Sequence, residues 1–291
     1  MKLATYLYKD VYHVGAVLDG EVADAGEVYS GLQGMPSFLR GGDVCLNALR
    51  DTIESKRQRL AFEDIELAAP VLKPAKFFGV GLNYTDHIEE TGRDKPEYPT
   101  YFNKQSSCVI GPGQAIHRPR VSEKLDYEGE LGIVIGRHCR HVPIDSINEV
   151  IAGYLVVNDV SVRDWQMRSH TWTLGKSFDT HGPIGPWIVT ADELGDPHTL
   201  DINTWVNDER RQSFNTRHLL FDCYFLIEYL SRVMTLEPGD IISTGTSSGV
   251  GVMMNPRGYM KPGDVVRIEI ERIGVLENPV IEEPGDTAFI D

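Results

Sequence analysis

Three acidic side chains stand at the ends of two apolar segments and could together bind a metal ion. Glu128 and Glu130 lead into the apolar run Leu131 to Ile135, and residues two apart on a strand project from the same face. Asp159 follows a second apolar run, Ile151 to Val157. Carboxylate oxygens are the ligands that Mg²⁺, Mn²⁺ and Ca²⁺ prefer. The pattern therefore predicts a site for a hard divalent cation, with its remaining positions left to water or substrate.

Simpler interpretations of the same residues stay open at this level. Glu128 and Glu130 could lie in solvent at the mouth of their strand, and Asp159 could be the N-cap of a helix that begins directly after it. Burying adjacent carboxylates is costly unless one is protonated or a cation lies between them. The residue types and spacing alone do not choose between a metal site and these alternatives.

Two other patterns suggest chemistry that their context excludes. The segment from Gly245 to Gly249 matches the G-x-S-x-G pattern of serine hydrolases, but no helical pattern follows it and no histidine follows His218. We interpret it as a tight turn whose Thr244 or Thr246 contacts substrate. The segment His138-Cys139-Arg140-His141 offers zinc-type ligands without a second ligand cluster, which favours a surface loop.

The elements that must position these residues are mainly strands. The first seventy residues alternate apolar and polar positions around one helical pattern from Asp43 to Lys56, and Pro70 to Pro74 marks a boundary. A long helix is predicted from His218 to Met234, with Thr216 as its N-cap. Further strands are predicted at Leu131 to Ile135, Gly153 to Asn158, Trp187 to Thr190, Ile202 to Val206, Asp240 to Ser243 and Val265 to Glu271.

Composition removes several classes of partner. The 291 residues carry 43 Asp and Glu against 28 Lys and Arg, a formal charge of −15, so clustered positive charge for nucleic acid or an anionic membrane is not expected. Hydrophobic residues make up 41 % and charged residues 24 %, as in an ordinary globular protein. Four scattered cysteines and the lack of a long apolar run predict a cytoplasmic protein without a disulfide framework.

Several blocks occur in a fixed order along the sequence, namely Gly81 to His87 with Glu90, Phe102 to Lys104, Asp126 to Glu130, Asn158 to Gln166, Gly175 to Thr180 and Thr244 to Thr246. Together they resemble the fumarylacetoacetate hydrolase family, over roughly residues 74 to 282. The resemblance implies a mainly β fold with α/β elements, namely a mixed β-sandwich roll at residues 73–291. It also implies a homodimer and one divalent cation held by Glu128, Glu130 and Asp159. The alternating pattern ahead of the boundary predicts a small N-terminal β-rich α+β domain at residues 1–72.

The same resemblance implies roles for individual residues. His87 would be the base that activates water, oriented by Glu90 on a lid, and Lys176 would supply positive charge to an oxygen anion. Without the resemblance, the pattern favours an exposed helical histidine beside acidic neighbours for His87. Arg163 and Gln166 would then simply share one face of a helix. The substrate-binding residues would be Tyr84, Lys104, Arg163, Gln166 and Thr246.

A carboxylate-bound cation with open positions suits a substrate that offers two oxygens, such as a 2-oxo acid. We therefore predict a hydrolase acting on carbon–carbon bonds in ketonic substances. It would cleave the C3–C4 bond of a 2,4-diketo acid, either an acylpyruvate or a 2,4-diketo-3-deoxy sugar acid, to pyruvate and a carboxylic acid. Mg²⁺ is the predicted cation, with Mn²⁺ or Ca²⁺ as alternatives. Other hypotheses are decarboxylation of oxaloacetate or keto–enol isomerisation at the same site, and a non-catalytic metal- or ligand-binding β module.

Overall fold

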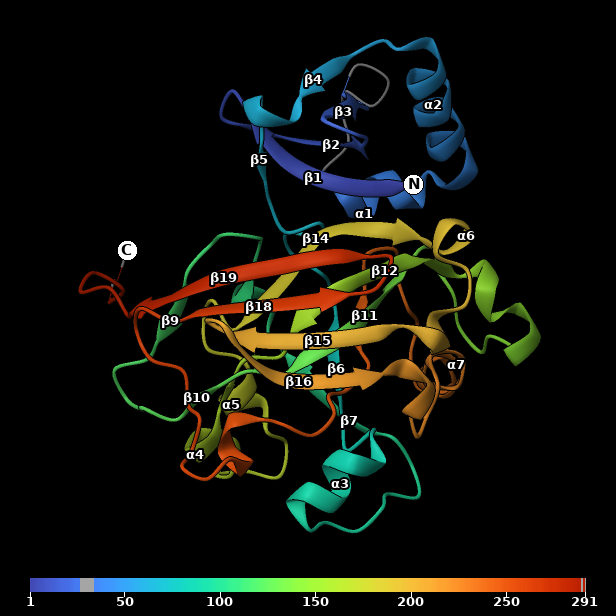
Figure 1. The fold of residues 1–291 in the computed structure, drawn as a ribbon. Helices are drawn as coiled ribbons and strands as arrows, with labels where there is room; N and C mark the ends of the chain where they lie inside the picture. Colours follow the sequence, from blue (N-terminus) through green and yellow to red (C-terminus); the bar gives the residue numbers. More distant parts are fainter. Residues whose placement is uncertain (27–33, 289, 291) are drawn as a thin grey trace.

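A twelve-stranded sheet forms the centre of the computed structural model, which describes residues 1–26, 34–288 and 290 (Figure 1). Neighbouring strands are antiparallel except for the β17–β6 and β14–β8 pairs. In spatial order the strands are β4 (Arg59–Ala61), β3 (Glu21–Asp24), β2 (Val11–Val17), β1 (Lys2–Tyr8), β14 (Gly182–Thr190), β12 (Ile151–Asn158), β11 (Gly129–Ile135), β17 (Ile241–Ser243), β6 (Phe77–Gly81) and β7 (Thr100–Lys104), with β5 (Glu66–Leu67) beside β1 and β8 (Val109–Ile110) beside β14.

A second sheet of five strands packs across β11, β12 and β14, in front of them in Figure 1. Strand β18 shows why the layers hold together, because Val266, Ile268 and Ile270 alternate inward and join the main apolar core. The predicted β-sandwich is therefore confirmed. The strands, in spatial order, are β16 (Glu209–Asn215), β15 (Asp201–Val206), β18 (Val265–Ile270), β19 (Gly274–Glu282) and β9 (Ile116–Arg118), and a separate pair joins β10 (Leu125–Asp126) to β13 (Ser161–Val162).

Helices are short and lie around the sheets. The α-helices are α1 (Met35–Arg40), α2 (Gly42–Ser55), α3 (Thr85–Thr91), α4 (Arg163–Gln166), α5 (Thr173–Lys176), α6 (Ala191–Leu194) and α7 (Cys223–Val233). The 3-10 turns are η1 (Phe62–Asp64), η2 (Ser106–Cys108), η3 (Ile144–Glu149), η4 (Pro197–Thr199), η5 (Thr216–His218) and η6 (Gly251–Met253).

The predicted start of the long helix is wrong. Helix α7 begins at Cys223, because the Asp222 carboxylate accepts hydrogen bonds from the backbone N–H groups of Tyr224 and Phe225 at 3.0 and 2.8 Å. Thr216 instead lies in η5, where its hydroxyl accepts a hydrogen bond from the Leu200 N–H. The apolar period continued through the turn and concealed the better capping residue.

The N-terminal unit is joined to the rest of the molecule by a strand pair. Lys2 and Leu3 of β1 pair with Val189 and Ile188 of β14, so one sheet runs through both parts (Figure 1). The predicted boundary at residue 72 falls in the connection between β5 and β6. The division into two domains stays a prediction.

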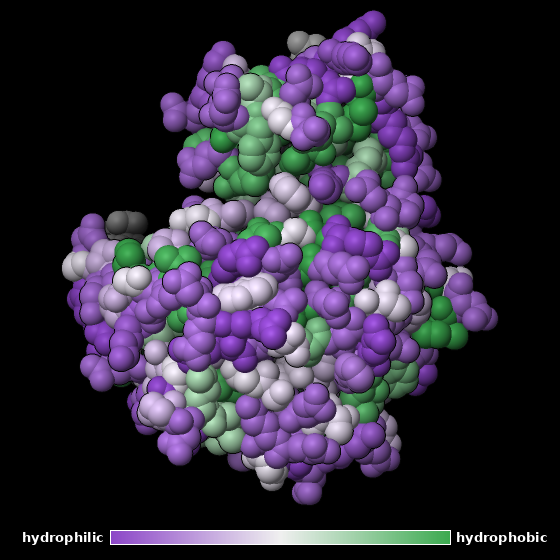
Figure 2. Space-filling view, in the orientation of Figure 1, coloured by the Kyte–Doolittle hydropathy of each residue, from purple (hydrophilic) through white to green (hydrophobic). Residues whose placement is uncertain are grey.

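The visible outer face of the five-stranded sheet is largely hydrophilic, whereas hydrophobic residues gather on the N-terminal unit and along its junction with the larger part (Figure 2). Within the described residues, none of the helices has the length and apolar character needed to cross a membrane. The strands predicted at residues 131–135, 153–158, 187–190, 202–206, 240–243 and 265–271 correspond to β11, β12, β14, β15, β17 and β18.

Candidate active site

The ends of β11 and β12 bring the three acidic residues together. Gly129 pairs with Asn158, and the Asp159 N–H donates to the Glu128 carbonyl at 2.9 Å, so the carboxylates of Glu128, Glu130 and Asp159 converge. They are only 5 %, 1 % and 0 % exposed, and one oxygen from each lies within 4.8 Å of the others. A solvated strand end is therefore excluded for the glutamates.

The helix-cap interpretation of Asp159 is also wrong. Strand β13 lies between Asp159 and α4, whose N-cap position is Val162. The Asp159 carboxylate instead accepts hydrogen bonds from two lysines, from Lys104 Nζ at 2.7 Å and from Lys176 Nζ at 2.7 Å. Its place at the end of a strand was predictable, but its partners are distant in sequence.

Buried cations compensate two of the three carboxylates. Lys176 Nζ lies 2.6 Å from Glu128 Oε2 and 2.7 Å from Asp159 Oδ2, so one ammonium group bridges both acids. Arg163 Nη1 donates to Glu128 Oε1 at 2.7 Å. Because buried charges are tolerated when they are paired and hydrogen-bonded, this network explains how several ionised groups fit inside the protein.

Glu130 differs from its neighbours because its hydrogen-bond donors are uncharged. The Ser243 hydroxyl and the Gly245 N–H donate to Glu130 Oε2 at 2.5 and 2.8 Å. Burial, together with the charges of Asp159 and Glu128, raises the pKa of Glu130 well above its usual range. Burial acts in the same direction on Glu128, but Lys176 and Arg163 outweigh it and hold the pKa of that carboxyl well below its usual range.

This donor set fits a divalent cation. The oxygens of Glu128, Glu130 and Asp159 are hard ligands that are close enough to share one ion, and Glu130 has no cationic side chain within hydrogen-bonding distance among the described residues. An ion at this point would offset the repulsion that raises the pKa of Glu130. These three are also the only group of such residues with metal-binding spacing in the described chain.

Helix α3 carries a histidine–glutamate pair toward the carboxylates. His87 Nδ1 lies 3.2 Å from Glu90 Oε2, and Glu90 Oε1 accepts a hydrogen bond from the Gly249 N–H at 2.9 Å. The i,i+3 spacing places both side chains on one side of the helical turn. His87 is buried, so the alternative of an exposed helical histidine is wrong. With Nδ1 held by Glu90, Nε2 is the ring nitrogen left for a reacting proton.

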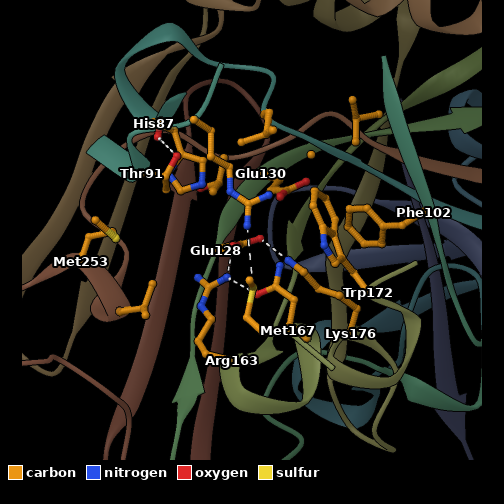
Figure 3. A pocket seen from close by; sticks show the side chains of 17 residues that line it. His87, Thr91, Phe102, Glu128, Glu130, Arg163, Met167, Trp172, Lys176 and Met253 are labelled. Atoms are coloured by element: carbon orange, nitrogen blue, oxygen red, sulfur yellow. Dashed lines mark hydrogen bonds and ion pairs between the residues drawn. The ribbon is translucent and has the colours of Figure 1, made fainter. Parts of the chain in front are cut away.

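His87, Glu128 and Glu130 line one cavity of about 210 Å³ (Figure 3). This volume is below the roughly 300–1,000 Å³ of sites for drug-sized ligands, so the cavity suits a small molecule. Trp172 and Phe102 form one side of it, with their ring centroids 5.7 Å apart, and the Trp172 ring occupies the space that a side chain at Gly81 would need. The other lining residues are Val80, Leu82, Thr91, Arg93, Arg163, Gln166, Met167, Lys176, Thr246, Val252 and Met253.

Arg163 offers the cavity an unused donor. Its Nη2 atom is buried without a hydrogen-bond partner among the described residues, whereas Nη1 donates to Glu128 and Gln166. Buried polar atoms are normally paired, so an unpaired guanidinium nitrogen indicates a ligand acceptor at this position. A carboxylate is the acceptor that a guanidinium group binds best.

Asp126 is a site residue that sequence reasoning missed. It is fully buried, its Oδ2 accepts from Arg163 Nε at 2.7 Å and from the Val252 N–H at 2.9 Å, and its Oδ1 accepts from the Gly251 N–H at 2.8 Å. It therefore holds both the arginine and η6. The available signal was its position two residues before Glu128, which continues the period of two.

A family model described as fumarylacetoacetate (FAA) hydrolase C-terminal matches residues 76–281, more than half of the sequence. The chain belongs to the fumarylacetoacetate hydrolase family. The match spans every residue of the site described above. The predicted membership is confirmed, and with it the mixed β-sandwich roll.

Relatives within the fumarylacetoacetate hydrolase family are named for different activities. A mitochondrial oxaloacetate tautomerase of Homo sapiens is 41 % identical over 249 residues, which is 85 % of this chain and 79 % of the relative. A solved maleylpyruvate hydrolase of Sphingobium sp. SYK-6, in complex with manganese(II) and pyruvate, is 32 % identical with a TM-score of 0.80, covering 98 % of this chain and 100 % of that one.

A 5-carboxymethyl-2-hydroxymuconate delta-isomerase structure from Mycobacterium smegmatis is 35 % identical with a TM-score of 0.79, covering 97 % of this chain and 100 % of that one. The family thus includes hydrolases, isomerases and tautomerases. Membership makes this chain a metal-dependent enzyme of that general type and leaves its particular reaction to be proposed.

The predicted substrate-binding residues of this family member fall into two sets. Arg163, Gln166 and Thr246 line the cavity, as do the predicted catalytic residues His87 and Lys176. Tyr84 and Lys104 are not among the lining residues. The Tyr84 ring packs edge-on against Phe214, and Lys104 lies behind the cavity, where its ammonium group contacts Asp159 and the carbonyls of Lys176 and His181.

The two excluded sequence patterns have structural roles. Gly245 donates its N–H to Glu130, and the Thr246 hydroxyl donates to the Gly129 carbonyl at 2.9 Å, so the segment after β17 braces β11. Only the short 3-10 turn η6 follows it, which is not the helix of a serine-hydrolase elbow. His138 lies on the surface and pairs with Glu237.

Proposed function

We propose that this protein interconverts the keto and enol forms of a small 2-oxo acid of the oxaloacetate type, with a divalent cation bound by Glu128, Glu130 and Asp159. The observation that carries the proposal is one small cavity lined by His87, Glu128, Glu130 and Arg163. Beside it Asp159 completes the group of three carboxylates, Glu90 holds His87, and Arg163 Nη2 is unpaired. These are a base, a cation site and an anchor for the acid group.

The chain's own residues would bind and orient the acid first. The Arg163 Nη2 donor would take one oxygen of the C1 carboxylate, in line with the preference of guanidinium for carboxylate. Lys176 Nζ uses two donors on Glu128 and Asp159, which leaves a third for a substrate oxygen. Burial lowers the pKa of Lys176, but Asp159 and Glu128 raise it above the ordinary lysine value, so the ammonium form is kept.

His87 would then move the proton. Enolisation breaks one C3–H bond, passes that proton to Nε2 of His87 and leaves the electron pair delocalised onto the 2-oxo oxygen. Nε2 then gives the proton to that oxygen, which completes the enol and returns His87 to its starting state. Glu90 accepts a hydrogen bond from Nδ1–H of the ring, which leaves Nε2 to take the proton. A cation held by the three carboxylates would supply Lewis-acid stabilisation of the negative charge on that oxygen.

The relatives and the cavity size support this choice of reaction. The 41 % identical relative is a tautomerase of oxaloacetate, a four-carbon acid, and a cavity of about 210 Å³ suits an acid of that size. Keto–enol isomerisation was an alternative at the level of sequence. It needs the base and the cation site but no attacking water.

The test is to add the oxaloacetate enol to purified protein with Mg²⁺ or Mn²⁺, and to follow both enol absorbance and pyruvate. Tautomerisation predicts faster loss of the enol without pyruvate, and His87→Ala should slow it by about 10²- to 10⁴-fold, since that is the usual contribution of a general base. An enol decay unaffected by the protein would refute the proposal. Pyruvate released from oxaloacetate would instead identify a decarboxylase.

Hydrolysis of a C3–C4 bond, the activity predicted from the sequence, is the second candidate. Support comes from the maleylpyruvate hydrolase structure with bound pyruvate and from the His87–Glu90 pair, which could equally activate water. Acetylpyruvate in the same assay distinguishes the two, because only a hydrolase would form pyruvate and acetate from it. Metal-induced stabilisation without turnover of either acid would favour the non-catalytic binding module.

Magnesium and a homodimer stay predictions. Metal analysis of the protein, with activity restored to the metal-free form by Mg²⁺, Mn²⁺ or Ca²⁺ separately, would identify the cation. Sedimentation or light scattering would give the number of subunits.

A further inference from the structure

One cationic side chain of the cavity, Arg93, takes no part in the proposed proton transfer. Arg93 follows α3 directly, after Gly92 ends the helix in a left-handed conformation, and the Arg93 N–H donates to the Ile88 carbonyl at 3.2 Å. Its side chain lines the same cavity as His87 and Glu130. Nothing in its sequence context, between a helix-terminating glycine and Asp94, distinguishes it from a solvated surface residue.

The charge of Arg93 is available, whereas the other cavity cations are neutralised. Arg163 pairs with Asp126 and Glu128, and Lys176 pairs with Glu128 and Asp159. No carboxylate among the described residues pairs with Arg93. The cavity therefore presents a third cation whose guanidinium donors can take an anionic ligand.

Two cavity side chains hold the Arg93 guanidinium in place. It lies 5.6 Å from the centroid of the Trp172 ring, and Nη2 lies 3.7 Å from the Met167 sulfur. An aromatic face attracts a guanidinium group and restricts its rotation without occupying its in-plane donors. Apart from the N–H that Nη2 directs at the Met167 sulfur, those donors remain free for a planar bidentate acceptor such as a carboxylate.

We propose that Arg93 binds the distal carboxylate of the substrate and makes the protein selective for dicarboxylic 2-oxo acids. This inference rests on the proposed function for the position of the C1 carboxylate, which Arg163 and the cation site would bind. The second carboxylate would then lie on the α3 side of the cavity, against Arg93 and Trp172. A substrate bound at both ends would connect α3, and so His87, to the strands that carry Glu128 and Glu130.

Arg168 provides a matched control for Arg93. It too is an exposed arginine whose guanidinium packs on an indole ring, 3.7 Å from the centroid of Trp165, but it does not line the cavity. The variants Arg93→Met and Arg168→Met remove the same charge and keep a long apolar side chain. An effect of the lower net charge, or of a lost contact with an indole ring, would appear in both variants. The loss of a contact with the substrate carboxylate would appear only in Arg93→Met.

Binding is measured by calorimetry with Mg²⁺ present, using malate and 2-hydroxybutanoate, which differ only in a carboxylate or a methyl group at C4. Arg93→Met should raise the Kd of malate about 10- to 100-fold, the usual range for one charge-assisted contact, and leave that of 2-hydroxybutanoate unchanged. Arg93→Lys should restore part of the affinity, and Arg168→Met should bind both acids as the parent does.

Turnover gives an independent measurement with oxaloacetate and its 4-methyl ester. Arg93→Met should lower kcat/KM for oxaloacetate by the same 10- to 100-fold and leave the ester unaffected. Equal losses for both members of a pair, or equal effects of the two arginine variants, would overturn the role of Arg93. Suppose that Arg93→Met selectively loses malate binding, but the parent protein turns over neither oxaloacetate nor its ester. This result would refute the proposed function but not the role of Arg93.

Discussion

The two ends of β11 are equally buried but have opposite chemistry. At one end Glu128 pairs with Lys176 and Arg163 and forms one carboxylate group with Glu130 and Asp159, and at the other end Ile133 and Ile135 pack in the main apolar core. Burial of the aliphatic end stabilises the fold by roughly 25 cal/mol per Å² of apolar surface. Burial of ionised groups costs free energy that their pairing only offsets. The apolar end of β11 thus holds in place the acidic residues at its other end, whose mutual repulsion opposes their burial.

Among the substitutions that test this comparison, removal of an acidic ligand should have the largest effect on activity. Glu128→Ala deletes one of the three carboxylates and leaves Lys176 and Arg163 with one acid fewer. We expect kcat to fall by about 10³-fold or more, since Lewis-acid stabilisation contributes several kcal/mol. The loss should match that caused by EDTA in the parent enzyme, and Mg²⁺ should restore only the parent. Full activity of the variant would show that Glu128 is not a metal ligand.

A substitution at the apolar end of β11 should instead lower the stability of the protein and leave its activity unchanged. Ile133→Ala leaves a cavity in the apolar core, so the free energy of unfolding should drop by about 2–5 kcal/mol while kcat of the folded protein stays unchanged. Urea denaturation and steady-state kinetics at low temperature measure the two effects separately. A comparable loss of kcat would show that the two ends of β11 are not independent.

A smaller effect is expected at Asp126, which supports the site without lining the cavity. Asp126→Asn keeps one acceptor oxygen but removes the charge that pairs with Arg163 Nε at 2.7 Å. Because Arg163 would be held less firmly, KM should rise by about 10-fold, with a weaker effect on kcat. Asp126→Glu should recover part of the affinity. An equal fall in kcat with KM unchanged would contradict a positioning role.

Acid should destabilise the folded protein in part through His181, whose carbonyl accepts a hydrogen bond from Lys104 beside the site. Burial, helped by the nearby charge of Lys104, lowers the pKa of His181 from 6.5 to about 3. The unfolded chain therefore binds this proton below about pH 6.5 and the folded protein does not, so stability falls by about 1.4 kcal/mol per pH unit as the pH drops from 6.5 toward 3. Denaturation between pH 7 and 4 should show a shallower fall for His181→Gln. Parallel curves would exclude this contribution.

Periodicity predicted the carboxylates of this site because they belong to strands. The alternation of two placed Glu128 and Glu130 on one face, and the apolar run before Asp159 placed it at a strand end. The local pattern could not distinguish burial from exposure. That depends on Lys176 and Arg163, which come from α5 and α4 and reach the carboxylates only through tertiary packing.

Residues whose position depends on distant partners were less predictable. Tyr84 and Lys104 lie in blocks that match the family, yet their side chains pack behind the cavity and not along it. Arg93 gave no signal, because its neighbours Trp172 and Met167 are more than seventy residues away. The start of α7 was misplaced for a local reason, since Leu219 and Leu220 continue the helical period before the Asp222 cap.

The pairing of β1 with β14 has a consequence for the solubility of fragments. Leu3 and Phe38 of the N-terminal unit share one apolar cluster with Val134, Leu155 and Ile188 of the larger part. A fragment lacking the first 72 residues would keep every proposed catalytic group but expose an aliphatic sheet face and an unpaired stretch of β14. Such edges recruit strands from other molecules. The N-terminal unit therefore covers a surface of the larger part that we expect to aggregate when it is exposed.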